Sequence, residues 1–234
     1  MSAQISVHLD QHKATYRDWP FWQTTATWTI DSTMSELSLP TFGSFPNRLL
    51  RLYAGLALYG AGIALQIESR LGGSPWDVFH QGLSIHLGLS IGAWIILVGA
   101  LVMLLWIPLR QRPGIGTVSN VVLLGLFADA AMWLVPAPEP LVARWAYLLL
   151  GVVATGAATG LYIGAGLGPG PRDGLMTGLN RLGLSIRSAR TLIEVTVLAA
   201  GWSLGGVVGF GTVVFALAIG PLSQFFMPRT LPKG

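Results

Sequence analysis

Two short polar segments carry the side chains whose types and spacing could bind an ion or a polar solute. Each segment contains a Pro-x-Asp sequence, followed by polar residues four and seven positions after the aspartate. The first segment supplies Asp77, Gln81 and Ser84, and the second supplies Asp173, Thr177 and Asn180. In a helix, this spacing puts the three side chains of a segment on one face. The aspartates could then bind a cation, a proton or an amino group.

Two further residues make these polar faces unequal. His80 borders the first face, and Arg172 immediately precedes the aspartate of the second. Trp76 occupies the position in the first segment that Arg172 occupies in the second. An aromatic ring opposite a cation suits a polar solute with two chemically different ends.

The aspartates also have a purely structural explanation. Ser74 can cap a helix that begins at Pro75, and Asp77 completes a pair that resembles a capping box. Gly170 and Pro171 repeat this arrangement with a weaker cap. Each aspartate would then satisfy free N–H groups at the positive end of its helix. Capping and binding both remain open from the sequence.

A third carboxylate lies inside an apolar run. Glu194 follows Arg190 by four residues, on a stretch that is otherwise apolar. A carboxylate within a membrane is expensive, which makes it a candidate for ion or solute binding. The alternative is a local Arg190–Glu194 pair near the inner membrane surface.

Other kinds of chemistry find little support. The chain has no cysteine and four histidines, none of them in a HExxH pair. We find no nucleophile paired with a base, no cluster of metal ligands and no nucleotide loop. The net charge of +4 comes without a basic stripe or interleaved aromatics. We therefore expect no enzyme, no cofactor, no bound metal and no nucleic-acid partner.

The composition identifies the elements that position these residues as membrane helices. About half of the 234 residues are apolar and 10% are charged, whereas soluble domains average about a quarter charged. Six apolar runs approach the ~20 residues that a helix needs to cross a bilayer. These runs are 49–67, 91–109, 117–135, 145–166, 188–206 and 210–228. The polar segments, 75–88 and 171–185, are too short to cross comfortably as helices.

The chain repeats itself internally. Pro75 and Asp77 align with Pro171 and Asp173. After a gap of one residue, Gly-Leu-Ser-Ile at 88–91 aligns with the same four residues at 183–186, and Gly-x-Gly-Thr at 114–117 aligns with 209–212. Each half therefore reads as a long helix, a short Pro-x-Asp helix and two more long helices. We expect the Gly-x-Gly-Thr sequences to form tight turns between antiparallel helices.

The arginines favour one topology over another. If the short helices are re-entrant, each half crosses three times and the two halves are inverted. Ten of the twelve loop cations then lie on the inner side with the N-terminal tail. If the short helices span, there are eight crossings, parallel halves and only eight inner cations. The positive-inside rule favours the six-span, inverted arrangement.

This arrangement divides the chain into three regions. Residues 1–45 are predicted to form a polar, disordered tail, 46–140 the first membrane repeat and 141–230 the second. Met34 would serve as an ordinary start, so we expect residues 1–33 to contribute little. The fold class predicted is an all-α, polytopic bundle of about six spans, with a short re-entrant helix in each inverted repeat.

The landmarks of both halves resemble a known group of proteins. Gly-Ser-Pro-Trp-Asp at 73–77, Gly-Pro-Gly-Pro-Arg-Asp-Gly at 168–174 and the Gly-x-Gly-Thr turns are similar to those of the YczE/YyaS/YitT-type bacterial integral membrane proteins. The resemblance covers residues 48–228. It implies a multi-pass protein of the bacterial cytoplasmic membrane, and it implies no particular activity.

Repeats with broken helices are typical of secondary transporters, which bind solutes near the bilayer midplane. We therefore expect a permease for a small polar solute or cation, with its site between the two Pro-x-Asp helices. The alternative is the substrate-binding membrane subunit of an ATP-driven importer. The expected partners are the lipid bilayer and the solute, and a homodimer remains open.

Overall fold

In the computed structural model, the described part of the protein comprises residues 44–230, so almost all of the predicted tail lies outside the described residues. Eight helices form this part: α1 (Phe45–Ser69), α2 (Pro75–Leu87), α3 (Ile91–Leu105), α4 (Ile115–Leu134), α5 (Leu141–Gly164), α6 (Pro171–Arg181), α7 (Ile186–Ser203) and α8 (Phe210–Thr230). The all-α prediction is confirmed. The short helix predicted over 171–185 ends at Arg181, because Gly183 turns the chain with a φ of 100°.

Four of the described helices, α1, α4, α5 and α8, are long and apolar enough to cross a membrane. The pair α2 and α3, which bends by 112°, raises the number to five if it counts as one span. The predicted count of six is higher than both. The predicted span 91–109 is an α-helix over only 15 residues in α3, about 22 Å of helix. The other predicted span, 188–206, corresponds to α7, which contains three charged residues: Arg187, Arg190 and Glu194.

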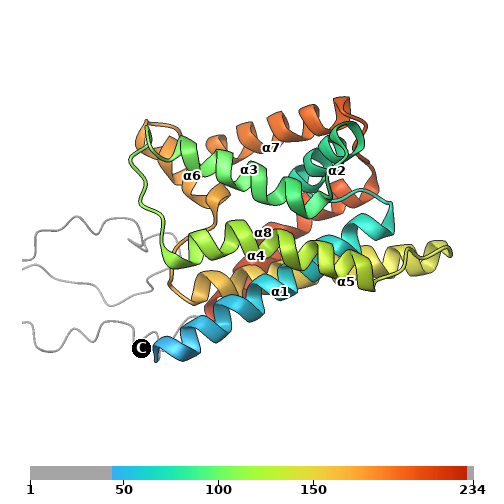
Figure 1. Cartoon of the computed structure of the whole chain (residues 1–234), viewed down its shortest axis with the longest axis horizontal. Helices are drawn as coiled ribbons and strands as arrows, with labels where there is room; N and C mark the ends of the chain where they lie inside the picture. Colours follow the sequence, from blue (N-terminus) through green and yellow to red (C-terminus); the bar gives the residue numbers. More distant parts are fainter. Residues whose placement is uncertain (1–43, 231–234) are drawn as a thin grey trace, which may run out of the picture. The chain divides into compact units, whose positions relative to one another are not determined.

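The helices pack in two groups (Figure 1). The four candidate spans form the first group, in the contact order α4, α1, α5, α8. The shorter helices form the second group, in which α2 contacts α3 and α7, and α6 contacts the same two helices. Helices α3 and α6 also pack on α4. Both Pro-x-Asp helices therefore belong to the second group.

Helices α1 and α5 are antiparallel and are tied together at both ends. Arg48, near the start of α1, donates hydrogen bonds to the carbonyl oxygens of Ala165 (2.9 Å) and Gly166 (2.6 Å) after α5. Arg144, near the start of α5, donates in the same way to Ser69 (2.7 Å) and Arg70 (2.8 Å), where α1 ends. A cation is favourable at a helix C-terminus, where carbonyl groups lack partners within the helix. These contacts join the start of each helix to the end of the other.

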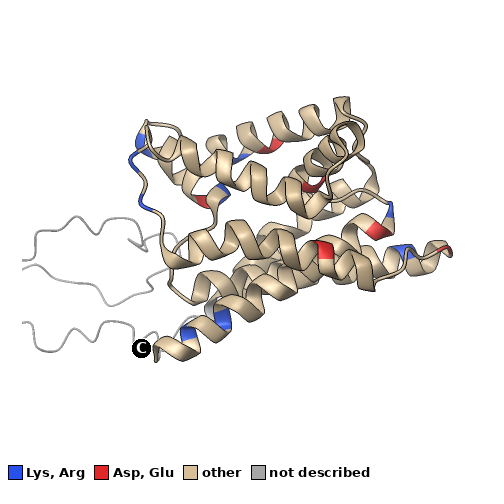
Figure 2. Ribbon diagram, in the orientation of Figure 1, with Lys and Arg blue, Asp and Glu red and all other residues tan. Residues whose placement is uncertain are grey.

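Charges are sparse along the helices and concentrate at their ends and connections (Figure 2). Only a few charged side chains sit along the helices of the second group, among them Asp77, Arg172, Asp173 and Glu194. These few charges include the residues that the sequence singles out.

Candidate functional site

The start of α6 is held by the other half of the chain. The Gly-x-Gly-Thr sequence that opens α4 binds the segment before α6. The Gly116 N–H donates to the Leu167 carbonyl at 2.8 Å, and the Thr117 hydroxyl donates to the Pro169 carbonyl at 2.8 Å. A side chain at Gly116 would lie 3.0 Å from Leu167. The glycine therefore permits this close approach.

The start of α2 is held in the corresponding way. The Gly211 N–H, in the second Gly-x-Gly-Thr sequence, donates to the Leu71 carbonyl at 2.7 Å. A methyl group at Gly211 would overlap the Gly72 carbonyl oxygen. Both sequences were predicted to form tight turns, but only Gly114 and Gly209 precede the helices, and residues 115–117 and 210–212 form the first turns of α4 and α8. Each motif also docks the loop that positions the short helix of the other half.

The capping prediction for α2 is confirmed. The Ser74 hydroxyl oxygen accepts from the Asp77 N–H at 3.2 Å and donates to Asp77 Oδ2 at 2.6 Å. Asp77 is buried, and its other oxygen, Oδ1, has no partner among the described residues. Because a buried polar atom without a partner is costly, this oxygen calls for a further donor or a cation. Capping therefore uses one oxygen of Asp77 and leaves the other available.

The start of α6 is built differently. Gly170 provides no side-chain cap, and Asp173 instead accepts a hydrogen bond from the Tyr162 hydroxyl at 2.6 Å. The Tyr162 ring stacks on Tyr59, with 6.2 Å between centroids. On the other side, the Trp106 indole N–H donates to the Pro171 carbonyl at 3.0 Å. Side chains of α1, α3 and α5 thus fix the start of α6.

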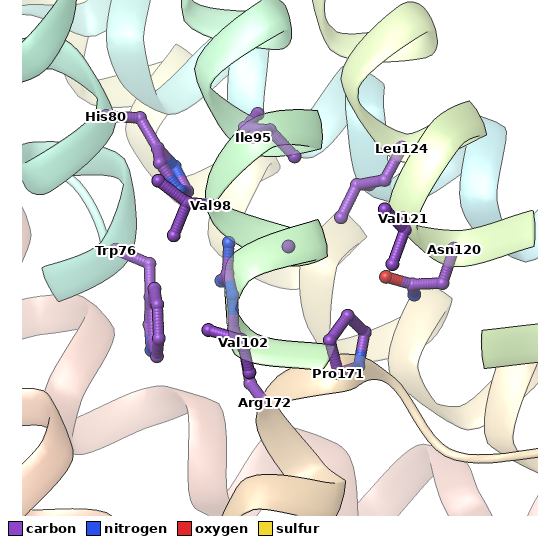
Figure 3. A pocket seen from close by; sticks show the side chains of 11 residues that line it. Trp76, His80, Ile95, Val98, Val102, Asn120, Val121, Leu124, Pro171 and Arg172 are labelled. Atoms are coloured by element: carbon purple, nitrogen blue, oxygen red, sulfur yellow. The ribbon is translucent and has the colours of Figure 1, made fainter. Parts of the chain in front are cut away.

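The starts of the two short helices meet at a buried cavity (Figure 3). The Arg172 guanidinium lies over the Trp76 ring, 4.6 Å from its centroid, and its end points toward His80. The cavity has a volume of about 20 Å³, which is room for about one water molecule. Its polar lining comes from Arg172, His80 and Asn120, and its apolar lining includes Val98, Val102 and Val121. Both ring nitrogens of His80 are buried and lack a partner among the described residues.

A second cavity, of about 10 Å³, lies on the other side of α2. Gln66, Asp77 and Gln81 line it. The Gln66 amide nitrogen donates to Thr155 Oγ1 at 3.0 Å, while its buried oxygen has no partner among residues 44–230. Gln81 Oε1 accepts from the Val207 N–H at 2.7 Å. Two unpartnered acceptor oxygens, from Gln66 and Asp77, therefore border this space.

The remaining predicted site residues have local partners. Ser84 and Asn180 donate to the carbonyls of Leu89 and Leu184, both at 2.7 Å, and so hold the turns that end the two short helices. Thr177 donates to the Gly174 carbonyl within its own helix at 3.0 Å. None of these three side chains lines either cavity.

The Arg190–Glu194 pair is present, at 2.8 Å between Nε and Oε1, on a partly exposed face of α7. Glu194 lines neither of the two cavities. Among the described residues, no group of three or more His, Asp or Glu side chains is placed to hold a metal ion.

Sequence reasoning missed Gln66, Asn120 and Tyr162. Gln66 and Asn120 are buried polar residues inside apolar helices, and an uncharged polar residue in such a run is a usable signal. Tyr162 gives no such signal, because tyrosine is common in membrane helices. Its contact with Asp173 depends on the turn between α5 and α6, which the spacing does not reveal.

Comparison with known proteins places the chain in a protein family. A family described as one of unknown function, DUF6198, matches residues 46–228. A Haemophilus influenzae protein described as uncharacterized is 41% identical over 177 residues, covering 75% of this chain and 81% of its own length.

Two Bacillus subtilis proteins are also similar. The uncharacterized membrane protein YczE is 39% identical over 182 residues, which cover 76% of this chain and 85% of YczE. The uncharacterized protein YyaS is 27% identical over 179 residues, which cover 74% and 89% of the two chains. No solved structure matches the chain significantly. The resemblance to YczE and YyaS and the multi-pass membrane location are confirmed.

Proposed function

This chain belongs to the family of unknown function DUF6198, and we propose that it is a secondary transporter of a small polar solute. The observation that carries the proposal is the meeting of Arg172 and Trp76 at the starts of two short helices. Helix ends inside a membrane protein are tolerated mainly where they line a cavity, and transporters place their solute sites there. The cavity beside this contact is lined by His80, whose two ring nitrogens lack a partner among the described residues.

Inverted repeats form the second part of the proposal. Arg48 and Arg144, at equivalent places in the sequence repeat, make equivalent hydrogen bonds to each other's half. Because α1 and α5 are antiparallel candidate spans, equivalent helices would cross the bilayer in opposite directions. This supports a topology of six crossings in which α2 and α6 are re-entrant. Such a pair of repeats can exchange conformations and so expose one site to each side in turn.

The charges near the cavity support a site for a solute and a coupling cation. Arg172 lies close enough to Asp77 and Asp173 for its charge to act on both carboxylates. Two carboxylates and one guanidinium leave one negative charge to be balanced inside the protein, which a proton or cation could do. We propose no catalytic role.

The test begins with a thermal-shift screen of purified protein against amino acids, vitamins, organic acids and cations. Uptake of a stabilising solute is then measured in proteoliposomes that contain this protein alone. We expect uptake without ATP, driven by an ion gradient. Uptake that needs a co-purified ATPase would instead assign the protein to an ATP-driven importer. An absence of uptake for every solute that binds, both with and without a co-purified ATPase, would contradict both versions.

Two variants separate binding from capping. Asp77→Asn and Asp173→Asn keep the side-chain shape and one acceptor oxygen, so a capping role alone predicts a stability cost of about 1 kcal/mol or less. A binding or coupling role predicts loss of uptake in a protein that still folds. We expect this loss for at least one variant, with Glu139→Gln, on the exposed α4–α5 connection, as the control. Normal uptake by both variants would limit these aspartates to capping.

A further inference from the structure

We propose that the solute is a small organic monocarboxylate, and that Arg172 binds its carboxylate group. This inference rests on the proposed transport function and deepens it by naming the charge of the solute. The sequence repeat does not require an arginine at this position, because the residue equivalent to Arg172 in the first half is Trp76. The structure adds three observations: the state of Arg172, the neighbouring polar groups and the character of the cavity wall.

Arg172 is presented to the cavity without an acidic partner. Its guanidinium stacks on Trp76 at 4.6 Å, and among the described residues the ion pair within 4.0 Å is Arg190–Glu194, which does not involve it. Stacking on a ring holds the guanidinium plane and leaves its N–H edge free. A guanidinium edge matches a carboxylate, which can accept two parallel hydrogen bonds from it.

Asp77 and Asp173 do not compete for that edge in the described structure. Ser74 binds one oxygen of Asp77, and Tyr162 binds Asp173. Neither aspartate lines the cavity beside Arg172. Arg172 therefore gives the cavity lining a positive charge, whereas Asp77 and Asp173 lie outside the lining.

Two neutral polar groups complete the polar wall. His80 is only 1% exposed, and both of its ring nitrogens lack a partner among residues 44–230. Asn120 is 5% exposed and lines the opposite side of the same cavity (Figure 3). Each can donate one hydrogen bond to a carboxylate oxygen that Arg172 already holds. A bound carboxylate would thus accept a hydrogen bond from the buried His80 ring, which has no partner among the described residues.

The rest of the wall selects the kind of anion. It is aliphatic: Ile95, Val98, Val102, Val121 and Leu124. One cationic side chain matches one negative charge, and two carboxylates behind the wall disfavour a dianion such as phosphate. The aliphatic surface accepts a hydrocarbon body rather than a second polar group. The wall therefore matches a monocarboxylate with an apolar tail.

The cavity is too small for an organic solute in this state. A volume of about 20 Å³ holds one water, so a larger solute needs α3 and α6 to separate. Trp106 fills the space between these helices and bonds to Pro171, beside Arg172. Entry of the solute and movement of Trp106 are thus coupled in the proposal.

The experiment measures melting temperatures of the purified full chain in detergent. The probes are straight-chain monocarboxylates from formate to hexanoate, each matched with its neutral amide, and inorganic phosphate. We expect a saturable rise with carboxylates, an optimum chain length and no rise with amides or phosphate. Equal rises with acids and amides, or no rise with any acid, would overturn the proposal.

Variants then assign the effect to Arg172. Arg172→Gln should weaken carboxylate binding roughly 10- to 100-fold, because a charge-assisted pair is lost. Arg181→Gln, the same change at the exposed end of the same helix, should leave affinity unchanged. If Arg172→Gln does not fold, Arg172→Lys and Asn120→Leu replace it, and both should weaken binding. Unchanged affinity in the folded Arg172 variants would contradict the proposal.

Uptake in proteoliposomes separates this inference from the proposed function. A carboxylate that binds through Arg172 but is not taken up supports the site and contradicts transport. Uptake of an amine or a neutral solute, with no binding of carboxylates, supports transport and overturns the carboxylate assignment.

Discussion

Helix α2 packs against α7, and α6 packs against α3. These two contacts join helices that are equivalent in the sequence repeat, but they are built from different side chains. In the first, Gly201 lets α7 approach the α2 backbone, so that a side chain there would lie 2.6 Å from Phe79. In the second, the position equivalent to Gly201 in the sequence repeat is Trp106. Its ring lies against Gly174 of α6, where any side chain would overlap it.

This difference locates the cavity. The α2–α7 contact is backbone against backbone, whereas an indole ring separates α3 from α6. The cavity lies on the α3–α6 side, and α3 supplies Ile95, Val98, Gly99 and Val102 to its wall. A ring can move by changing rotamer, but two touching backbones cannot separate without moving whole helices. We therefore infer that the α3–α6 contact opens more readily.

The prediction with the largest expected effect is that the two ends of α3 lie on opposite sides of the membrane. Cysteines are introduced at Leu89 and Arg112, on the exposed turns before and after α3, in a chain that has no cysteine of its own. Since α3 is a crossing in the proposed inverted topology, an impermeant maleimide should label one of the two cysteines in intact cells and reach the other only after the cells are permeabilised. Labelling of both in intact cells would show that α3 does not cross, and would contradict the six-span inverted topology.

The second expected effect is a loss of stability when the ring between α3 and α6 is removed. Trp106 is 2% exposed, so Trp106→Ala leaves a large cavity and should lower the free energy of unfolding by about 3 kcal/mol. Trp202→Ala is the matched control, because Trp202 is 69% exposed. Thermal unfolding in detergent compares them, and a similar drop for both would argue against a special role of the α3–α6 contact.

Much of this comparison follows from the sequence. The Pro-x-Asp starts, the Ser74 cap and the Arg190–Glu194 pair depend on local spacing, and all three are present as predicted. The number of spans was less predictable. Apolar runs show where lipid-compatible residues lie, but they do not show where a helix ends. The apolar run 91–109 continues past Leu105, where α3 ends.

The cavity itself required the tertiary structure. Asn120 and Arg172 lie 52 positions apart in the chain, and docking between the halves brings them to one space. The sequence indicated that Asp77 has a partner, but it did not indicate that Gln66 shares its cavity. Contacts between halves depend on how the Gly-x-Gly-Thr sequences bind the opposite loops.

A smaller effect tests whether the two halves are equivalent at their ends. Arg48→Gln and Arg144→Gln each remove two hydrogen bonds from a guanidinium to carbonyls at a helix C-terminus. Each should cost about 1–2 kcal/mol, because such bonds are charge-assisted and partly exposed. Equal costs, measured by unfolding in detergent, are expected. A difference above ~1 kcal/mol would show that the two equivalent arginines contribute unequally to the free energy of unfolding.

The smallest effect distinguishes a cap at the site from a cap elsewhere. Ser74→Ala removes the cap of α2, and Ser185→Ala removes the corresponding cap of α7, where Ser185 accepts from the Ser188 N–H at 3.1 Å. Each should lower the free energy of unfolding by about 1 kcal/mol. Only Ser74→Ala also removes a hydroxyl that donates to a buried carboxylate, since Ser74 donates to Asp77 Oδ2 at 2.6 Å.

The loss of this donor to Asp77, which lines the second cavity with Gln66, should change the affinity for a coupling cation or the pH dependence of uptake. Ser185 is exposed and donates to no carboxylate, so its variant should change stability alone. Uptake is measured against cation concentration and pH for both variants and the parent. If the two serine variants have the same uptake profile as the parent, the second cavity does not bind the coupling cation. Asp77 would then serve to stabilise the start of α2, and the cavity lined by Arg172, His80 and Asn120 would be the remaining candidate site.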